Sequence, residues 1–347
     1  MADQIVIAVD AVGGDKGSGV VVEGVLSALG KDPGIRVILV GPEDVVVPAA
    51  AQHERIDACI ATESIAMDEH PAQAVRKKKD SSIVVGNRLV REGKAQGFYS
   101  PGSTGACLAA ATLVVGRIKG VSRPALCTVL PSPKRPVVLC DVGANADCKP
   151  SYLVQFAQMA TVYAQIALDI EAPRVALLNI GEEDTKGSQL AQESFALLRQ
   201  EVPAFIGNAE GNDLLDGPAD VYVTDGFTGN VALKTLEGTA KVLMGEIKSV
   251  MTAGVLTKLG ALAMKDGLTR LKASMSSDTY GAAPLLGVKG VCMVGHGSSG
   301  PEAVESSLFA TAKCIRLDMP GRISQLVRQG SEEAQGSEAS DAGERLS

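Results

Sequence analysis

Three glycine-containing turns, each ahead of an amphipathic run, combine residue types that bind anions. The turns are Gly102-Ser-Thr-Gly105, Gly226-Phe-Thr-Gly-Asn230 and Gly297-Ser-Ser-Gly300. Amides at the start of a helix have no intrahelical partner, and the helix dipole places partial positive charge there. Because hydroxyl side chains supply further donors, each turn is suited to a phosphate. Ser103 and Thr104 are equally consistent with helix capping, which needs no ligand.

Basic residues that could balance an anion stand in the polar segments between apolar runs. They are Lys149, Lys186, Lys234 and the run Arg76-Lys-Lys-Lys79. A charge run of this kind is most often a solvated face, so the last of these is the weakest candidate. Three helix starts with interspersed lysines describe a site for a phosphate and a second oxygen-rich group.

The elements that position these residues alternate between short apolar runs and longer helical patterns. This rhythm predicts a mostly parallel sheet covered by helices. The expected strands are 5–9, 37–40, 125–130, 137–140, 175–178, 205–207, 221–223 and 291–294, and the expected helices are 20–29, 104–115, 152–168, 188–198, 231–251 and 302–317. The segment LPSPKRPVVL is short and rich in proline, so we expect its flanking strands to pair as an antiparallel hairpin.

Six expected strand ends run into loops that are dense in Gly, Asp, Asn and Lys. The loops are DAVGGDKGSG, YSPGSTGA, DVGANADCKP, NIGEEDTKGS, NAEGND and TDGFTGNVALK. Ligands of open α/β sheets bind beyond the carboxyl ends of the strands, so we expect all six loops to face one cleft. Any single loop of this kind is usually only a turn. Asp10, Asp141 and Asp225 can likewise cap helices or satisfy loop amides without touching a substrate.

The segment Gly295–Gly300 has the G-x-G-x-x-G spacing of a dinucleotide-binding fingerprint. That fingerprint needs a following strand and an acidic residue about 20 positions onward. The chain instead continues as a helix, and Asp318 falls at that helix's end. We therefore interpret this segment as a turn whose amides, with Ser298 and Ser299, line an anion or acyl site.

Composition excludes several classes of protein. The 347 residues carry a net charge of −7, which argues against a general nucleic-acid binder. The start MADQIVIAVD has no basic region ahead of its apolar run, and no apolar run approaches the roughly 20 residues of a membrane span. We expect a cytoplasmic protein.

Cysteine and histidine usage gives no sign of a metal site or a covalent nucleophile. The seven cysteines are widely spaced without a C-x-x-C pair, so buried free thiols are expected. Cys148 lies in a polar loop, but no histidine is near it in the sequence. With three histidines in the chain, we predict no metal and no cofactor.

Nine motifs, in order along the chain, closely resemble those of the PlsX family of phosphate acyltransferases. They are DAVGGD (10–15), DEHPAQAVRKKKDSS (68–82), SPGSTGA (100–106), DVGANADCKP (141–150), LLNIGEEDTKG (177–187), GNAEGND (207–213), DGFTGNVALKTLEG (225–238), YGAAPLLGVKG (280–290) and GHGSS (295–299). Ser103 departs from the family, which usually has Asn there; the effect of this change on phosphate affinity is left open.

The resemblance implies transfer of a fatty acyl group from acyl carrier protein to inorganic phosphate, giving acyl phosphate for phospholipid synthesis. It implies a three-layer α/β/α fold with a mostly parallel mixed sheet, like isocitrate dehydrogenase, isopropylmalate dehydrogenase or phosphotransacetylase. A homodimer, peripheral binding to the anionic inner face of the membrane and contact with the glycerol-phosphate acyltransferase that acts next are also implied.

Phosphate can attack the thioester directly, so the protein needs to position it and stabilise the oxyanion. On this hypothesis Lys186 and Lys149 position phosphate, Asn145, Asn179 and Asn208 donate to the carbonyl oxygen, and His296 hydrogen-bonds the leaving group. The expected phosphate and substrate residues are Asp10, Gly13, Gly14, Asp15, Gly102, Ser103, Thr104, Gly105, Asp225, Gly226, Thr228, Gly229, Asn230, Ser298 and Ser299.

Residues 240–275 carry an apolar stripe flanked by basic residues. Its apolar members include Val255, Leu256, Leu259, Leu262 and Ala263. Such a stripe suits a helix lying on anionic lipid, and the region looks like the family's protruding helical hairpin. The ordinary alternative is a helix packed in a dimer interface or a core. We expect one catalytic domain over 1–328, including this hairpin, and a disordered acidic tail over 329–347.

Two other functions stay open at this point. An NAD-linked decarboxylating dehydrogenase of similar architecture would need a metal-binding carboxylate set and a cofactor loop. A non-catalytic membrane-associated scaffold would not need six polar loops at strand ends.

Overall fold

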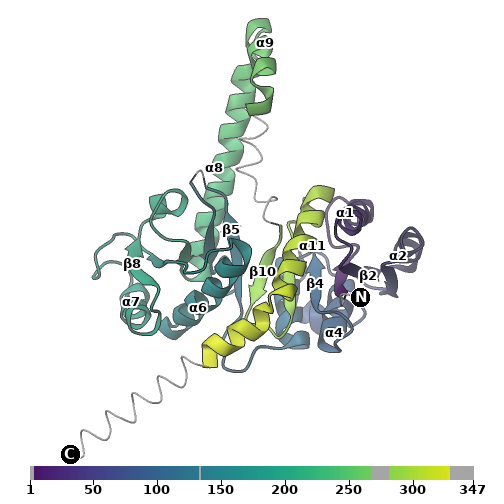
Figure 1. Ribbon diagram of the computed structural model, residues 1–347, viewed down its shortest axis with the longest axis horizontal. Helices are drawn as coiled ribbons and strands as arrows, with labels where there is room; N and C mark the ends of the chain where they lie inside the picture. The colour runs from purple at the N-terminus through teal and green to yellow at the C-terminus, as the bar shows by residue number, and fades with distance from the viewer. Residues whose placement is uncertain (1–3, 133, 268–280, 329–347) are drawn as a thin grey trace, which may run out of the picture.

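The computed structural model describes residues 4–132, 134–267 and 281–328, and one sheet of eleven strands runs through them (Figure 1). The order across the sheet is β3-β2-β1-β4-β11-β10-β5-β6-β9-β7-β8. The strands are β1 (Ile5–Asp10), β2 (Ile35–Gly41), β3 (Ile56–Ile60), β4 (Gly97–Ser100), β5 (Ala125–Leu130), β6 (Val137–Cys140), β7 (Val175–Leu178), β8 (Phe205–Ala209), β9 (Val221–Val223), β10 (Ala283–Leu286) and β11 (Val291–Val294).

Two parallel blocks of the sheet run in opposite directions. Strands β3, β2, β1, β4 and β11 are parallel to one another, and so are β6, β9, β7 and β8. Between the blocks, β10 pairs antiparallel with β11 and with β5, and β5 pairs antiparallel with β6. The strands of the second block therefore point against those of the first. Of the six polar loops, two follow strands of the first block, β1 and β4, and four follow strands of the second block, β6, β7, β8 and β9.

Helices cover both faces of the sheet. They are α1 (Ser18–Lys31), α2 (Glu43–Ala50), α3 (Pro71–Lys77), α4 (Ser82–Arg91), α5 (Thr104–Ala110), α6 (Pro150–Ala167), α7 (Gln189–Glu201), α8 (Gly226–Thr252), α9 (Val255–Ala263) and α11 (Pro301–Arg316). Alternate strand residues enter different cores, since side chains alternate across a strand. Cys127 belongs to the core that includes residues of α1, α6, α7 and α11, whereas Leu126 belongs to the core that includes residues of α3, α4 and α5. The expected three-layer α/β/α fold is confirmed.

The sequence predicted most of these elements and missed others. The antiparallel hairpin of β5 and β6 is confirmed. Strands β3, β4 and β10 and helices α2, α3 and α4 were not expected. β4 has four residues and starts with Gly97, and β10 contains Pro284, so neither resembles a typical strand in sequence. Helix α2 contains Pro48, which usually ends a helix.

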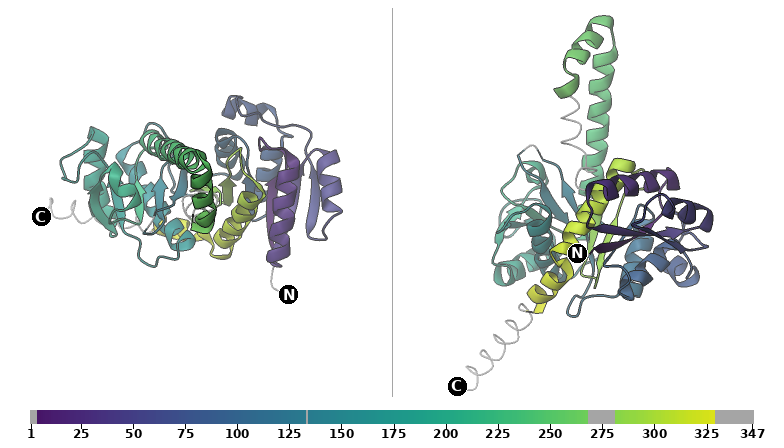
Figure 2. Two further views of the ribbon diagram at one scale, coloured as in Figure 1. Left: turned by 90° about the horizontal axis from the view of Figure 1, so that it is seen from above. Right: turned by 45° about the vertical axis from the view of Figure 1, so that its right-hand side comes forward.

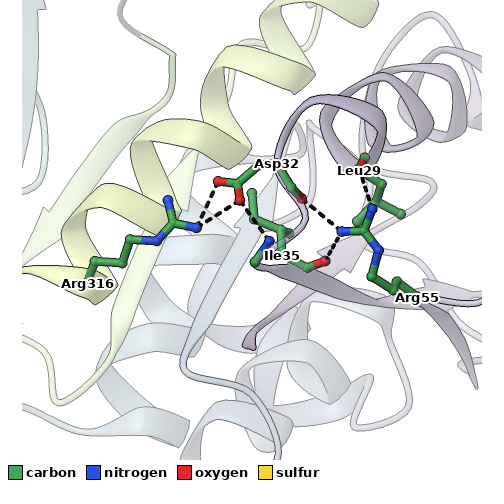
Figure 3. Close-up of polar contacts among 6 residues, drawn as sticks. Leu29, Asp32, Ile35, Arg55 and Arg316 are labelled. Carbon is green, nitrogen blue, oxygen red and sulfur yellow. Dashed lines mark hydrogen bonds and ion pairs between the residues drawn. The ribbon is translucent and has the colours of Figure 1, made fainter. Parts of the chain in front are cut away.

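Polar contacts fix α1 and β2 against α11 at one side of the sheet (Figure 3). Arg316 donates to both carboxylate oxygens of Asp32 at 3.0 and 2.8 Å. Arg55 donates to the carbonyls of Asp32 and Ile35 at 2.8 Å each, and also to that of Leu29. The bonds from Arg55 to Leu29 and Asp32 satisfy carbonyls at the end of α1, where the helix supplies no partners of its own.

Helix α8 projects far from the body of the protein, and α9 folds back along it (Figures 1 and 2). With 27 residues, α8 is about 40 Å long. Beyond the sheet it exposes apolar side chains, including Val242, Leu243 and Val250. Within the described ranges, no helix has the length and apolar content needed to cross a membrane.

The predicted membrane stripe, helical hairpin and tail are described only in part. Leu262 is 68% exposed, and Ala263 is also exposed. The side chains of Val255, Leu256 and Leu259 lie outside the description, as do hairpin residues 268–275 and the predicted tail 329–347.

Candidate active site

A cavity of about 340 Å³ lies over the middle of the sheet, between α5 and α8. Its floor comes from three adjacent strands, and Figure 1 shows β10 between the two halves of the molecule. The floor residues are Leu126 and Thr128 of β5, Ala283 and Leu285 of β10 and Val294 of β11. Leu126 pairs with Leu285 and Ala283 with Val294, so these side chains form a continuous, mainly apolar surface.

Residues from all three predicted anion-binding turns border this cavity. Thr104 and Gly105 begin α5, Asn230 is the fifth residue of α8, and Ser299 lies two residues before α11. The β6–α6 loop adds Gly143 beside Asn230. The tertiary structure thus brings residues of three turns from different parts of the chain to one cavity with a mainly apolar floor.

His296 lines the same cavity with a defined orientation of its ring. The backbone N–H of Ser298 donates to His296 Nδ1 at 3.2 Å, and Ser298 Oγ lies 2.8 Å from the same atom. Because Nδ1 accepts this hydrogen bond, the neutral imidazole carries its proton on Nε2. His296 is therefore arranged to donate a hydrogen bond. Ser298 orients the imidazole, while Ser299 borders the cavity itself.

One face of α8 forms a wall of the cavity. Asn230, Leu233, Lys234 and Glu237 follow the i, i+3, i+4, i+7 spacing that places side chains on one helical face. Lys234 Nζ lies 2.8 Å from a Glu237 carboxylate oxygen. Among the described residues lining the cavity, Lys234 is the one lysine or arginine. Glu237 was missed in the sequence, although the helical spacing from Asn230 could have found it.

Asp10 supports two of the turns from behind. It is fully buried and accepts a hydrogen bond from Ser100 Oγ at 2.7 Å, while Gly102 N donates to the same Ser100 Oγ at 3.0 Å. Burial raises the pKa of Asp10, and hydrogen bonds, the largest from Ser100, offset part of that rise. A side chain at Gly13 would overlap the Asp10 carboxylate, so glycine is needed there.

The rest of the β1 loop touches the turn after β11. Asp15 N donates to the carbonyl of Gly297 at 2.8 Å, and Gly14 lies against Gly297 and Pro101. Asp10, Gly13, Gly14 and Asp15 were predicted to bind substrate. The structure instead places them where they hold the turns, outside the cavity lining.

Asp141, directly after β6, organises the β6–α6 loop as Asp10 organises the turns near β1 and β4. Its carboxylate accepts from the amides of Gly143, Ala144 and Asn145 at 3.1, 3.0 and 2.7 Å, and from Leu126 N at 3.1 Å. Burial is again the main cause of a raised pKa. The Asn145 side chain donates to Asp141 at 2.9 Å and to the carbonyl of Pro124 at 2.8 Å. Both its amide hydrogens are therefore engaged, which disfavours the predicted donation to a substrate carbonyl.

The start of α8 packs directly on this loop. Gly226 N donates to the carbonyl of Asn145 at 2.7 Å, and a side chain at Gly229 would overlap the carbonyl oxygen of Asp141. Asp225 caps the helix by accepting from Thr228 N at 2.8 Å. Gly226 and Gly229 therefore allow close backbone packing that brings Asn230 to the cavity.

Several predicted substrate residues act as helix caps. Ser103 is buried, and its hydroxyl accepts from Ala106 N at 3.4 Å at the start of α5. Thr228 Oγ1 donates to Asp225 at 2.8 Å and, with Asn179, borders a separate hollow on the far side of the α8 start. Of the turn predicted at 102–105, only Thr104 and Gly105 line the cavity.

The loops after β7 and β8 form a separate polar group, which we call the outer loops (residues 179–188 and 208–213). Asn179 Nδ2 donates to the carbonyl of Lys186 at 3.0 Å, and Asn208 Nδ2 donates to the carbonyl of Glu183 at 2.9 Å. These residues brace each other at the far end of the sheet and do not line the cavity. Lys149 precedes α6, is exposed, and is also outside the lining.

The cysteines fit the expectation of free thiols, five of them buried. Cys148 is half-buried, and burial is the main cause that raises its pKa to about 11. A thiol with that pKa is almost entirely protonated near neutral pH, so it is a poor nucleophile.

The chain is similar to known proteins over most of its length. A family model described as "Fatty acid synthesis protein" matches residues 5–322. A phosphate acyltransferase of Desulfitobacterium hafniense is 50% identical over 89% of this chain and 93% of its own length. One from Heliobacterium modesticaldum is 47% identical over 92% of this chain and 97% of its own length.

Solved structures support the fold. A phosphotransacetylase from Streptococcus pyogenes aligns with a TM-score of 0.62 at 16% identity, covering 91% of this chain and 95% of its own. A branched-chain phosphotransacylase from Enterococcus faecalis aligns with a TM-score of 0.58 at 14% identity, covering 90% and 99%. The extent of the family match, together with relatives at 47–50% identity, shows that the chain belongs to the PlsX family of phosphate acyltransferases.

Proposed function

We propose that this protein transfers a fatty acyl group from acyl carrier protein to inorganic phosphate and releases acyl phosphate for phospholipid synthesis. One observation carries the proposal: the start of α5, a face of α8 that carries Asn230 and Lys234, and the turn before α11 meet at a cavity whose floor is mainly apolar. Helix starts bind anions, and an apolar floor accommodates an alkyl chain. Membership of the family supports the same reaction class.

The chemistry requires no covalent intermediate on the protein. A phosphate oxygen attacks the thioester carbonyl carbon, and the carbonyl oxygen becomes an oxyanion. When this intermediate collapses, the carbon–sulfur bond breaks, and the sulfur leaves with the electron pair as a thiolate. The protein accelerates this sequence by holding phosphate against the acyl carbon and by donating hydrogen bonds to the developing charge.

The cavity residues fit these tasks. In this proposal the amides of Thr104 and Gly105 and the Asn230 side chain, all in the cavity lining, hold phosphate, and Lys234 supplies positive charge. His296 presents Nε2–H, which suits donation to the oxyanion or to the departing sulfur. Among the described residues, the lining of this cavity includes none of Lys149, Lys186, Asn179 and Asn208. We therefore assign the chemistry to the residues that do line it.

Incubation with acyl carrier protein thioester and radiolabelled phosphate tests the proposal. Label should appear in acyl phosphate in proportion to the thiol released. Thiol release without labelled acyl phosphate would indicate a hydrolase, and the absence of both would reject the proposal.

We also propose that residues 1–328 act as one catalytic unit in a homodimer bound peripherally to the cytoplasmic membrane face. The projecting α8–α9 pair supports the membrane contact, because it exposes Val250, Leu262 and Met264 on a segment that also carries Lys248 and Lys258. The acyltransferase that uses acyl phosphate would meet its substrate at the same surface.

Leu262→Glu should abolish sedimentation with vesicles of anionic phospholipid, because a carboxylate opposes both apolar insertion and the negative surface. Activity on dissolved substrates should stay within about twofold, since Leu262 is remote from the cavity lining. Val47→Glu, at an exposed position on α2, is the matched control and should still bind. Equal sedimentation of all three proteins would rule out this membrane contact.

A further inference from the structure

The floor of the cavity differs from its rim in polarity, and the side chains that form the floor differ from one another in size. Donor groups gather at the rim, at the start of α5 and on the side chains of Asn230, Lys234 and His296, whereas the floor is built by strand side chains. Leu126, Leu285 and Val294 are 7%, 1% and 4% exposed and belong to the core beneath α5. Ala283 and Thr128 are the small members of the floor, and both are half-buried.

We infer that the acyl chain lies on this floor and that Ala283 and Thr128 set the chain length that the enzyme prefers. The inference rests on the proposed function and adds a specificity determinant to it. Ala283 pairs with Val294, directly before the turn that carries His296, so the floor begins beside the groups that act on the carbonyl. A chain attached to that carbonyl extends from the rim over β10 and β5.

The sides of the cavity restrict where the chain can go. Leu108 of α5 and Leu233 of α8 face it from opposite walls. At the third side, Ser307 of α11 donates its hydroxyl to the carbonyl of Ala303 at 2.6 Å, so this serine offers an alkyl chain no unpaired donor.

Strands at the centre of a sheet cannot move aside to accommodate added bulk. β10 is hydrogen-bonded on both edges, to β11 and β5, and Ala282 and Pro284, which flank Ala283 in the chain, are both buried. Close packing of this kind resists deformation. A larger side chain at Ala283 or Thr128 therefore removes cavity volume, and a smaller one at Thr128 adds it.

Thioesters of acyl carrier protein with chains of 8, 12 and 16 carbons, assayed with phosphate, test the inference. Ala283→Phe should lower the ratio of kcat/KM for 16 carbons to that for 8 carbons by at least about tenfold. Thr128→Leu should change this ratio in the same direction, and Thr128→Ala in the opposite direction. Val47→Phe, which adds a ring at an exposed site outside the cavity, should leave the ratio unchanged.

The outcomes separate this inference from the proposed function. If the unmodified protein makes acyl phosphate but the ratio stays constant in every floor variant, the inference is wrong and the function stands. Equal losses at all three lengths in folded variants also contradict it. If the unmodified protein makes no acyl phosphate at any length, the proposed function fails first. Should Ala283→Phe not fold, the two Thr128 variants still decide the question through opposite shifts.

Discussion

Two groups of loops in this molecule have the same composition and different surroundings. The turns at Thr104, Asn230 and Ser299 and the outer loops around Asn179, Lys186 and Asn208 are all rich in glycine and polar residues. The first group meets over the apolar centre of the sheet, whereas the outer loops hydrogen-bond one another beside β8 at its end. Residue type describes what a loop can bind, but its strand's place in the sheet determines what it faces.

The largest expected difference between the two groups is in catalysis. His296→Ala and Asn230→Ala should each lower kcat/KM roughly 100-fold or more, because each removes a donor aimed at developing or phosphate charge. The kcat/KM of each of three outer-loop variants, Asn179→Ala, Asn208→Ala and Lys186→Ala, should stay within about threefold of that of the unmodified protein. The reason is that these residues belong to the outer loops and do not line the cavity. Steady-state assays of all five variants give the comparison.

A large loss in Lys186→Ala, with the variant still folded, would contradict this division. Mixing Lys186→Ala with His296→Ala would then be informative, because recovered activity would show that the outer loops of one subunit complete the site of another.

A smaller difference is expected in stability. Gly229→Ala should lower the free energy of unfolding by about 1–3 kcal/mol, because the new Cβ would overlap the Asp141 carbonyl. Gly211→Ala, in the outer loops, meets no atom within 4 Å and should change it by no more than about 0.5 kcal/mol. Chemical denaturation measures both, and equal values would mean that the α8 start is not tightly packed.

The smallest effect concerns pH. Burial raises the pKa of Asp10 above its ordinary value of 3.8. The stabilisation that the protonated Asp10 side chain gives to the folded protein is therefore fully present below pH 3.8. It is lost as the pH rises through the raised pKa. We therefore compare the free energy of unfolding of the unmodified protein with that of Asp10→Asn. The first minus the second should decrease as pH increases from about 4 towards neutrality. Denaturation at several pH values measures this difference, and a rising difference would show that hydrogen bonds from Ser100 outweigh burial.

Much of this architecture was predictable because it depends on local pattern. Apolar runs such as Val175–Leu178 predicted buried strands, and the prolines of LPSPKRPVVL predicted the hairpin of β5 and β6. β10 was not predictable, because Ala-Pro-Leu-Leu lacks β-branched residues and gains its structure from β11 and β5 on either side. Missing β10 also hid the reversal of strand direction.

The candidate site divides in the same way. Thr104, Gly105, Asn230, His296 and Ser299 were predicted from turn chemistry and do line the cavity. Asp10 and Asp141 are buried and Asn145 is partly buried behind the turns, where neighbouring groups of the protein satisfy their polar atoms. No local pattern separates a carboxylate that faces a ligand from one that organises a loop.

The sequence by itself determined the alternation of strands and helices, the glycine-rich helix starts and, through its motifs, the family. Those properties depend on residues that are close together along the chain. Only the tertiary structure decided which helix starts share a cavity and that Ala283 and Thr128 lie at its floor. The physical reason is that these positions meet through pairing between strands distant in sequence, and the two antiparallel strands at the centre of the sheet set that pairing.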